Sequence, residues 1–255
     1  METIKNFVES YWKTLLFFAL TGLFGGFLIG LYLMDSYPPE IQQQILDQGI
    51  SSTLLGVVSA VQSAGYGLFL GAIGIVLGKQ TGLWKDERPI TKKPLALAIA
   101  ISVVGGAVMI LSDILVFGHY SEAIMNSYAV KPTATYLVAT VTYGAVIEEV
   151  MLRLFMMSLI AFLLRKLLWR KREATPVAAL VAANIVSSLL FAAGHLPTTF
   201  ILLGSTPIII LRCFLLNGGI GVLFGRLYRK YGLRYAMIAH GGCHLVSKLI
   251  WILFI

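Results

Sequence analysis

Apolar runs of about 20 residues follow one another along almost the whole chain, and they limit its possible folds more than any other feature. A helix needs about 20 such residues to cross the hydrocarbon core of a bilayer. We assign seven of these runs, over residues 14–34, 54–78, 95–116, 134–163, 177–195, 206–225 and 235–254. The sequence therefore predicts an all-α, polytopic integral membrane bundle of about seven transmembrane helices.

The composition excludes an ordinary soluble protein of this size. Of the 255 residues, 58% are hydrophobic and 13% are charged, whereas a soluble domain carries roughly 25% charged residues. No long polar stretch remains to form a separate soluble domain, and we expect no cleaved signal peptide at the N-terminus. Cys213 and Cys243 both lie in apolar segments, so they indicate no disulfide framework.

The basic residues segregate to one side when the seven runs are drawn as spans. All but four of the 20 lysines and arginines fall in the N-terminal segment or in the loops on its side. The exceptions are Lys131 on the opposite side and three residues within spans: Arg153, Arg212 and Lys248. By the positive-inside rule we expect a multi-pass cell-membrane protein with a cytoplasmic N-terminus and an external C-terminus. Anionic lipid then explains the net charge of +8, and we expect no nucleic-acid partner.

Three charged residues lie in the predicted span 134–163, where each costs about 2.5–3.5 kcal/mol at mid-helix on insertion scales. Glu149 and Arg153 are four residues apart and share a helix face, so we interpret them as a structural salt bridge. Glu148 is rotated by about 100° from Glu149 on an α-helix. We therefore expect Glu148 to be free to face a polar cavity.

Three of the four histidines also lie in or at the end of predicted spans. His195 follows Phe191 by one turn, just before an expected helix end at Pro197, and His240 and His244 share one face of the last span. If they converge with Glu148, the result is one carboxylate and three imidazoles in a protected pocket. Such a group can activate water with the carboxylate as base, or it can hold a divalent metal such as zinc. Both routes lead to hydrolysis.

These residues resemble the motifs of the CPBP family of CAAX proteases and bacteriocin-processing enzymes, which includes the type II CAAX prenyl endopeptidases. The family pattern is Glu-Glu-x-x-x-Arg, Phe-x-x-x-His and His-x-x-x-Asn. This chain has Glu148-Glu149-x-x-x-Arg153, Phe191-x-x-x-His195 and His240-x-x-x-His244. The resemblance covers about residues 134–250. It divides the chain into N-terminal spans with an interfacial segment (1–130) and a CPBP-like catalytic core (131–255), within one membrane domain.

The resemblance implies an intramembrane endopeptidase in which Glu148 activates water and His195, His240 and His244 assist it. A metal-assisted and a metal-free glutamate mechanism are equally open, and Glu148 and the same three histidines are the candidate metal ligands. The departure from the family is His244, where Asn is usual. A neutral histidine can donate an N–H to an oxyanion, as Asn does, or ligate a metal.

The resemblance also implies a peptide or membrane-protein substrate, met in the lipid bilayer. Prenylated C-terminal peptides and leader peptides are both compatible with it. Two other classes of function compete with a protease. In a proton- or cation-coupled transporter the same acids and histidines would be relay groups. In a non-catalytic scaffold or immunity protein the fold would persist without the chemistry.

Overall fold

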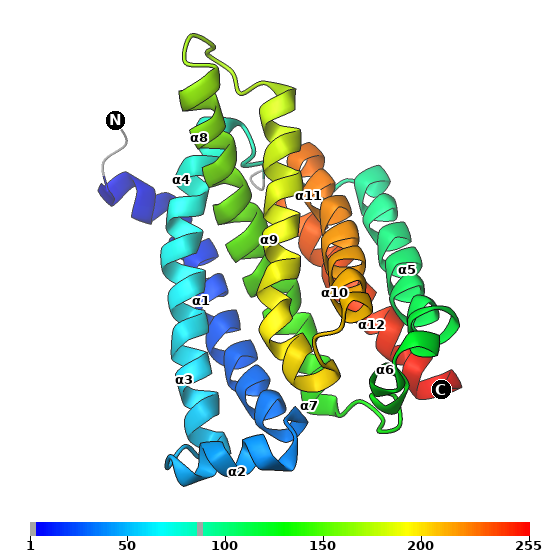
Figure 1. The fold of residues 1–255 in the computed structure, drawn as a ribbon. Helices are drawn as coiled ribbons and strands as arrows, with labels where there is room; N and C mark the ends of the chain where they lie inside the picture. Colours follow the sequence, from blue (N-terminus) through cyan, green and yellow to red (C-terminus); the bar gives the residue numbers. More distant parts are fainter. Residues whose placement is uncertain (1–3, 86–88) are drawn as a thin grey trace.

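The computed structural model describes residues 4–85 and 89–255, and it is a bundle of long helices (Figure 1). No β-strand occurs within these two ranges, so the predicted all-α class is confirmed. Six stretches in them are long and apolar enough to cross a membrane: Ile4–Ser36, Ser52–Thr81, Lys92–Tyr120, Val177–Leu203, Pro207–Tyr231 and Leu233–Phe254. The protein is therefore a multi-pass membrane protein.

The first half of the chain forms these elements in order: α1 (Ile4–Ser36), α2 (Pro39–Asp47), α3 (Ser52–Gly65), η1 (Tyr66–Leu70), α4 (Gly71–Thr81), α5 (Lys92–Leu115), η2 (Phe117–Tyr120) and α6 (Glu122–Asn126). The second half forms α7 (Ala134–Ala139), η3 (Thr140–Glu148), η4 (Val150–Met157), α8 (Ser158–Leu168), α9 (Val177–Leu203), α10 (Pro207–Cys213), η5 (Phe214–Gly219), α11 (Ile220–Tyr231) and α12 (Leu233–Phe254). The segment η2 is a 3-10 helix, and the other η segments are π-helices.

The predicted span 134–163 corresponds to α7, η3, η4 and α8, which follow one another without a break in helical structure. Figure 1 shows this stretch running from α7 at one end of the bundle to α8 at the other. It is not one of the six apolar stretches, because its charged side chains lower its hydropathy. All seven predicted ranges therefore correspond to helices that cross the bundle, and six of them are apolar enough to be recognised by composition alone.

The predicted end of the fifth span at His195 is wrong. Helix α9 continues through Pro197 to Leu203, so His195 lies inside a membrane helix. A proline removes one intrahelical hydrogen bond, but ending the helix at this depth would leave several backbone groups without partners in lipid. The glycine pair Gly241-Gly242 in α12 does not interrupt its helix either.

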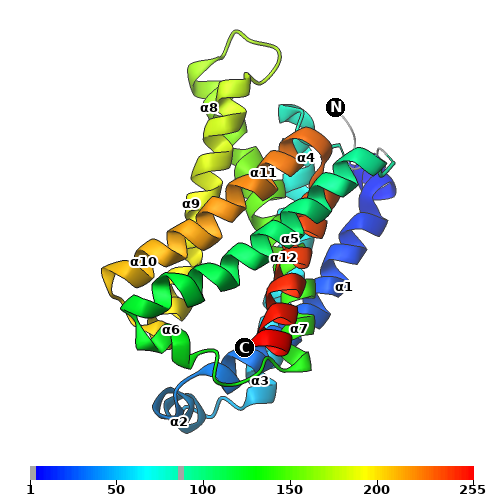
Figure 2. The ribbon, with the colours of Figure 1, turned by 90° about the vertical axis from the view of Figure 1, so that its right-hand side faces the viewer.

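The ends of the bundle separate the basic turns from the acidic and apolar ones. Figures 1 and 2 show four features at one end of the bundle: the beginning of α1, the end of α4 with the beginning of α5, the α8–α9 loop and the α11–α12 turn. Helices α2 and α6 and the C-terminus lie at the other. This is the alternation that the basic residues predict. One of those residues, Arg88, lies outside the described ranges.

Glycines allow α1 and α3 to approach each other closely. Gly22, Gly26 and Gly30 are buried on one face of α1, one turn apart. A Cβ atom at Gly22 would lie 2.5 Å from the carbonyl oxygen of Ser63 and 2.8 Å from the amide nitrogen of Ala64. Small residues of this kind replace bulky side chains in membrane helix contacts, and here they pack α1 against α3, next to the helix that carries Glu148.

We expect Gly22→Ala to destabilise the bundle by about 1–3 kcal/mol, because the added methyl group meets backbone atoms that cannot move aside. Thermal unfolding of the purified protein in detergent measures the effect. Gly65→Ala is the matched control, since a Cβ atom there meets only a ring atom of Phe69, at 4.0 Å. Equal unfolding temperatures for the two variants would contradict the close α1–α3 contact.

Candidate active site

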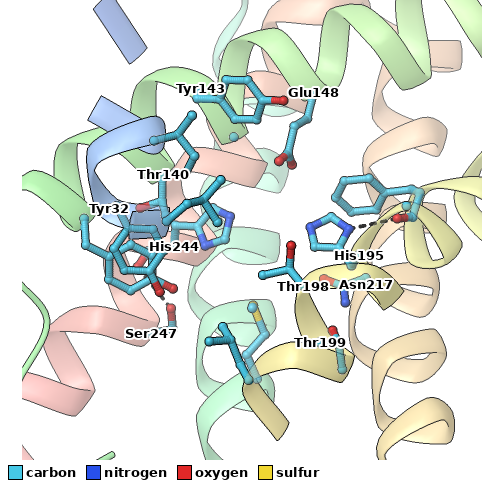
Figure 3. A pocket seen from close by; sticks show the side chains of 18 of the residues that line it. Tyr32, Thr140, Tyr143, Glu148, His195, Thr198, Thr199, Asn217, His244 and Ser247 are labelled. Carbon is cyan, nitrogen blue, oxygen red and sulfur yellow. Dashed lines mark hydrogen bonds between the residues drawn. The ribbon is translucent and has the colours of Figure 1, made fainter. Parts of the chain in front are cut away.

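A cavity of about 600 Å³ opens between the helices. Residues from α1, α5, η3, α9 and α12 line it, and four of the polar ones are Glu148, His195, His244 and Lys248. Figure 3 shows the Glu148 carboxylate directed into the space between His195 and His244, which lie on opposite walls. An ionisable residue facing a cavity at membrane depth is a candidate for function.

The two neighbouring glutamates lie in different environments. The side chains of Glu149 and Arg153 are fully buried, and Glu149 Oε1 lies 3.3 Å from Arg153 Nη1. Arg153 Nη2 also donates to the carbonyl of Gly221 at 2.9 Å, and its guanidinium lies over the ring of Phe191. The Glu148 side chain is 18% exposed. The structure thus forms the expected ion pair and leaves Glu148 at the cavity.

Glu149 has a second partner that the sequence did not indicate. Its Oε1 lies 2.9 Å from Nδ1 of His240. Because the carboxylate is also paired with Arg153, we assign the proton of this hydrogen bond to His240 Nδ1, which donates. The other ring nitrogen of His240, Nε2, lies 3.8 Å from Glu148 Oε2. Glu149 therefore orients the imidazole that stands beside Glu148, as a buried carboxylate orients the base of a catalytic triad.

The hydrogen bonds continue from His240 along α12. Nε2 of His244 lies 3.2 Å from Nε2 of His240, and Lys248 Nζ lies 3.4 Å from Nδ1 of His244. With Glu149 as the final acceptor, the donors all run in one direction: Lys248 to His244, His244 to His240, and His240 to Glu149. This order assigns the proton of neutral His244 to Nε2, the nitrogen nearest Glu148.

Gly144 leaves room for a small molecule between these groups. A Cβ atom at this position would lie 3.4 Å from His244 Nε2 and 3.9 Å from Glu148 Oε2. Gly144 is one turn before Glu148 in η3, so its missing side chain opens the cavity in front of the carboxylate. A water molecule placed there would have both a carboxylate and an imidazole within reach.

His195 stands on the opposite wall, in α9. Its Nδ1 lies 2.8 Å from the carbonyl of Phe191, and the two rings meet edge to face with centroids 4.6 Å apart. A carbonyl only accepts, so Nδ1 carries the proton and Nε2 is left with a lone pair. Figure 3 shows this hydrogen bond and the ring directed toward the cavity. His195 is thereby prepared to accept a hydrogen bond from water.

A second buried ion pair lines the same cavity, and sequence reasoning missed it. Arg212 binds Asp113 through two hydrogen bonds of 2.5 Å, and Tyr128 donates to Asp113 at 2.6 Å. Burial, and then the Asp113 carboxylate, raise the pKa of Tyr128, so its hydroxyl stays protonated. Asp113 and Arg212 are 99 positions apart, so no local motif connects them. Asn217 also lines the cavity and was not singled out.

The histidines and carboxylates around the cavity are the side chains that could hold a metal ion. The Nδ1 atoms of His195 and His240 are held by the Phe191 carbonyl and by Glu149, which leaves Nε2 as the possible ligand atom of each ring. Among the described residues, however, no group of three or more His, Cys, Asp or Glu side chains lies close enough together to hold a metal. The arrangement does not fit a metal centre, and no step of the mechanism below is routed through a metal.

Comparison with known proteins finds one family for the second part of the chain. Residues 130–246 match the model of the Rce1-like type II CAAX prenyl endopeptidase family. The match supports the assignment to the CPBP family. All three motifs lie inside the matched range, and the match supports a function of the intramembrane CAAX protease kind. No curated protein matches the chain significantly, and no solved structure does.

We expect Glu149→Gln to lower the free energy of unfolding by about 3–5 kcal/mol, because it leaves the buried Arg153 without its counter-charge. Glu148→Gln is the matched control. It makes the same chemical change one residue earlier at a carboxylate without a buried cation partner, and its effect should stay within about 0.5 kcal/mol. Thermal unfolding in detergent measures both. Glu148→Gln being the more destabilising variant would contradict the different roles of the two glutamates.

Proposed function

We propose that this protein is an intramembrane endopeptidase in which Glu148 is the general base that activates water. The observation that supports it is the position of Glu148, which faces the cavity with one carboxylate oxygen 3.8 Å from His240 Nε2. Glu149, its neighbour, is fully buried, and its Oε1 is already held by Arg153 and His240, so it does not face the cavity as a base. The family match supports the same reaction class.

In the proposed mechanism the water lies between Glu148 and His195. His195 Nε2 accepts one of its hydrogens and orients it, and Glu148 takes the other as the oxygen attacks the peptide carbonyl. The new C–O bond places negative charge on the carbonyl oxygen, and the donor that we assign to it is His244 Nε2–H, which turns to the oxyanion from the His240 Nε2 that accepts it in the resting site. When the C–N bond breaks, Glu148 returns its proton to the leaving amine. His240 accepts from His244 in the resting site and so positions its ring.

We propose C-terminal CAAX-type peptides as the substrate class, within the family's peptide and membrane-protein substrates. The large cavity supports this, because residues of the first three spans complete it: Ile29 and Tyr32 come from α1, and Asp113 comes from α5. The N-terminal part (1–130) would thus form one wall of the substrate site, and the core (131–255) would carry the chemistry.

We expect Glu148→Gln to lower kcat by about 10²–10⁴-fold, because an amide cannot accept the proton of water. His195→Ala and His240→Ala should also lose cleavage while the proteins still accumulate. The loss of kcat is measured as cleavage of a farnesylated fluorogenic CAAX peptide by the protein in proteoliposomes. Glu9→Gln, at an exposed glutamate in α1, is the control. Full turnover by purified Glu148→Gln would refute the role of Glu148.

We also propose that the N-terminus is cytoplasmic and the C-terminus external, in the cell membrane. The basic turns at one end of the bundle support this orientation. In a background without Cys213 and Cys243, a cysteine at Glu173 in the α8–α9 loop should react with an impermeant maleimide only after the cells are opened. A cysteine at Gln43 in α2 should react in intact cells. The reverse labelling pattern would contradict this orientation of the protein.

A further inference from the structure

Three basic residues lie inside the bundle, and two of them have a buried acidic partner. Arg153 is paired with Glu149, and Arg212 is paired with Asp113. Lys248 is the third, and it is 4% exposed. Among residues 4–85 and 89–255, no carboxylate lies within ion-pair distance of its Nζ. A charged group at this depth is costly unless something compensates it.

The contacts of Lys248 are neutral. Its Nζ lies 3.4 Å from Nδ1 of His244 and 4.3 Å from the centre of the Tyr136 ring. An ammonium group has three N–H donors, so two remain after His244 is satisfied. Lys248 also lines the 600 Å³ cavity. Its remaining donors are therefore available to an anion that enters the cavity with the substrate.

The contacts of Lys248 limit where that anion can be. Lys248 Nζ lies 3.4 Å from His244 Nδ1, and His244 Nε2 lies 3.2 Å from His240 Nε2. A carboxylate hydrogen-bonded to Nζ therefore lies at most about 12 Å from His240 Nε2, which stands beside Glu148. An extended peptide covers about 3.3–3.6 Å per residue, so the anion lies no more than about three residues beyond the scissile bond, where an endopeptidase acting near a chain end would meet the terminal carboxylate.

We propose that Lys248 is a specificity-determining residue whose ammonium group binds the free C-terminal carboxylate of the substrate. This inference rests on the proposed protease function and assigns a further subsite to it. Lys248 lies beyond the matched range 130–246, so the family match assigns no role to it. The cut then releases a short peptide, of at most about three residues, that carries the bound carboxylate.

The test compares two farnesylated fluorogenic peptides of one sequence, one ending in a free carboxylate and one in a carboxamide. The wild-type protein in proteoliposomes should cleave the carboxylate peptide about 10–100-fold more efficiently in kcat/KM, the expected loss of a charged hydrogen bond. The difference should arise mainly in KM. Lys248→Met, which keeps the length and apolar stem of the side chain, should cleave both peptides with equal efficiency, so that the preference for the carboxylate is lost.

Controls separate this subsite from other roles. Lys93→Met makes the same change at an exposed position and should keep the preference for the carboxylate. A third peptide, an amide with aspartate as its last residue, should be cleaved no better than the plain amide; full recovery would mean that a side-chain carboxylate is bound instead. If Lys248→Met loses kcat on all peptides but keeps the preference for the carboxylate, Lys248 acts only on His244 and the subsite is refuted.

Failure of the subsite and failure of the protease are distinguishable. If wild type cleaves the carboxylate and amide peptides with equal efficiency, the subsite is wrong and the protease function stands. If wild type cleaves none of the peptides, the proposed function fails together with the subsite. The wild-type comparison needs no variant, so it holds even where Lys248→Met folds poorly.

Discussion

The buried carboxylate of Glu149 is the contact on which the candidate site depends. One oxygen lies 3.3 Å from Arg153 and 2.9 Å from His240, and Arg153 in turn donates to Gly221. Three helical segments, η4, α11 and α12, thus meet at one ion pair that water does not reach. Such a pair adds little net stability after desolvation. The ion pair instead fixes how α12 is rotated about its own axis, because only one orientation of α12 brings His240 to this carboxylate and to Glu148.

The helix that carries the glutamates departs from α geometry on both sides of Glu149. Segments η3 and η4 are π-helical, a rare form that is frequent at functional sites. Neighbouring glutamates can therefore divide between the protein interior and the cavity without a break in the helix. Lipid favours this solution, since a true break would leave backbone groups unpaired.

The fold class could be predicted from the sequence because a bilayer leaves few structures for a chain with seven apolar runs. The different directions of the Glu148 and Glu149 side chains could also be predicted, from the rotation between adjacent residues of a helix. The helix end at Pro197 was predicted wrongly. A proline usually ends a helix, but in lipid the unwound backbone groups would have no hydrogen-bond partners, so the helix continues. The contact between Glu149 and His240 could not be predicted. It depends on how closely α12 packs on η3, where Gly241 lies against Ala145.

Lys248 explains how a histidine at position 244 can take the place of the Asn that is usual in the family. An asparagine amide donates an N–H whatever lies behind it, whereas a neutral histidine donates from Nε2 only when Nδ1 is the acceptor. Lys248 is one turn further along α12 and donates to that Nδ1. It therefore fixes the tautomer that can replace the amide. The same ammonium keeps two further donors for the cavity, so one lysine both supports His244 and reaches the substrate.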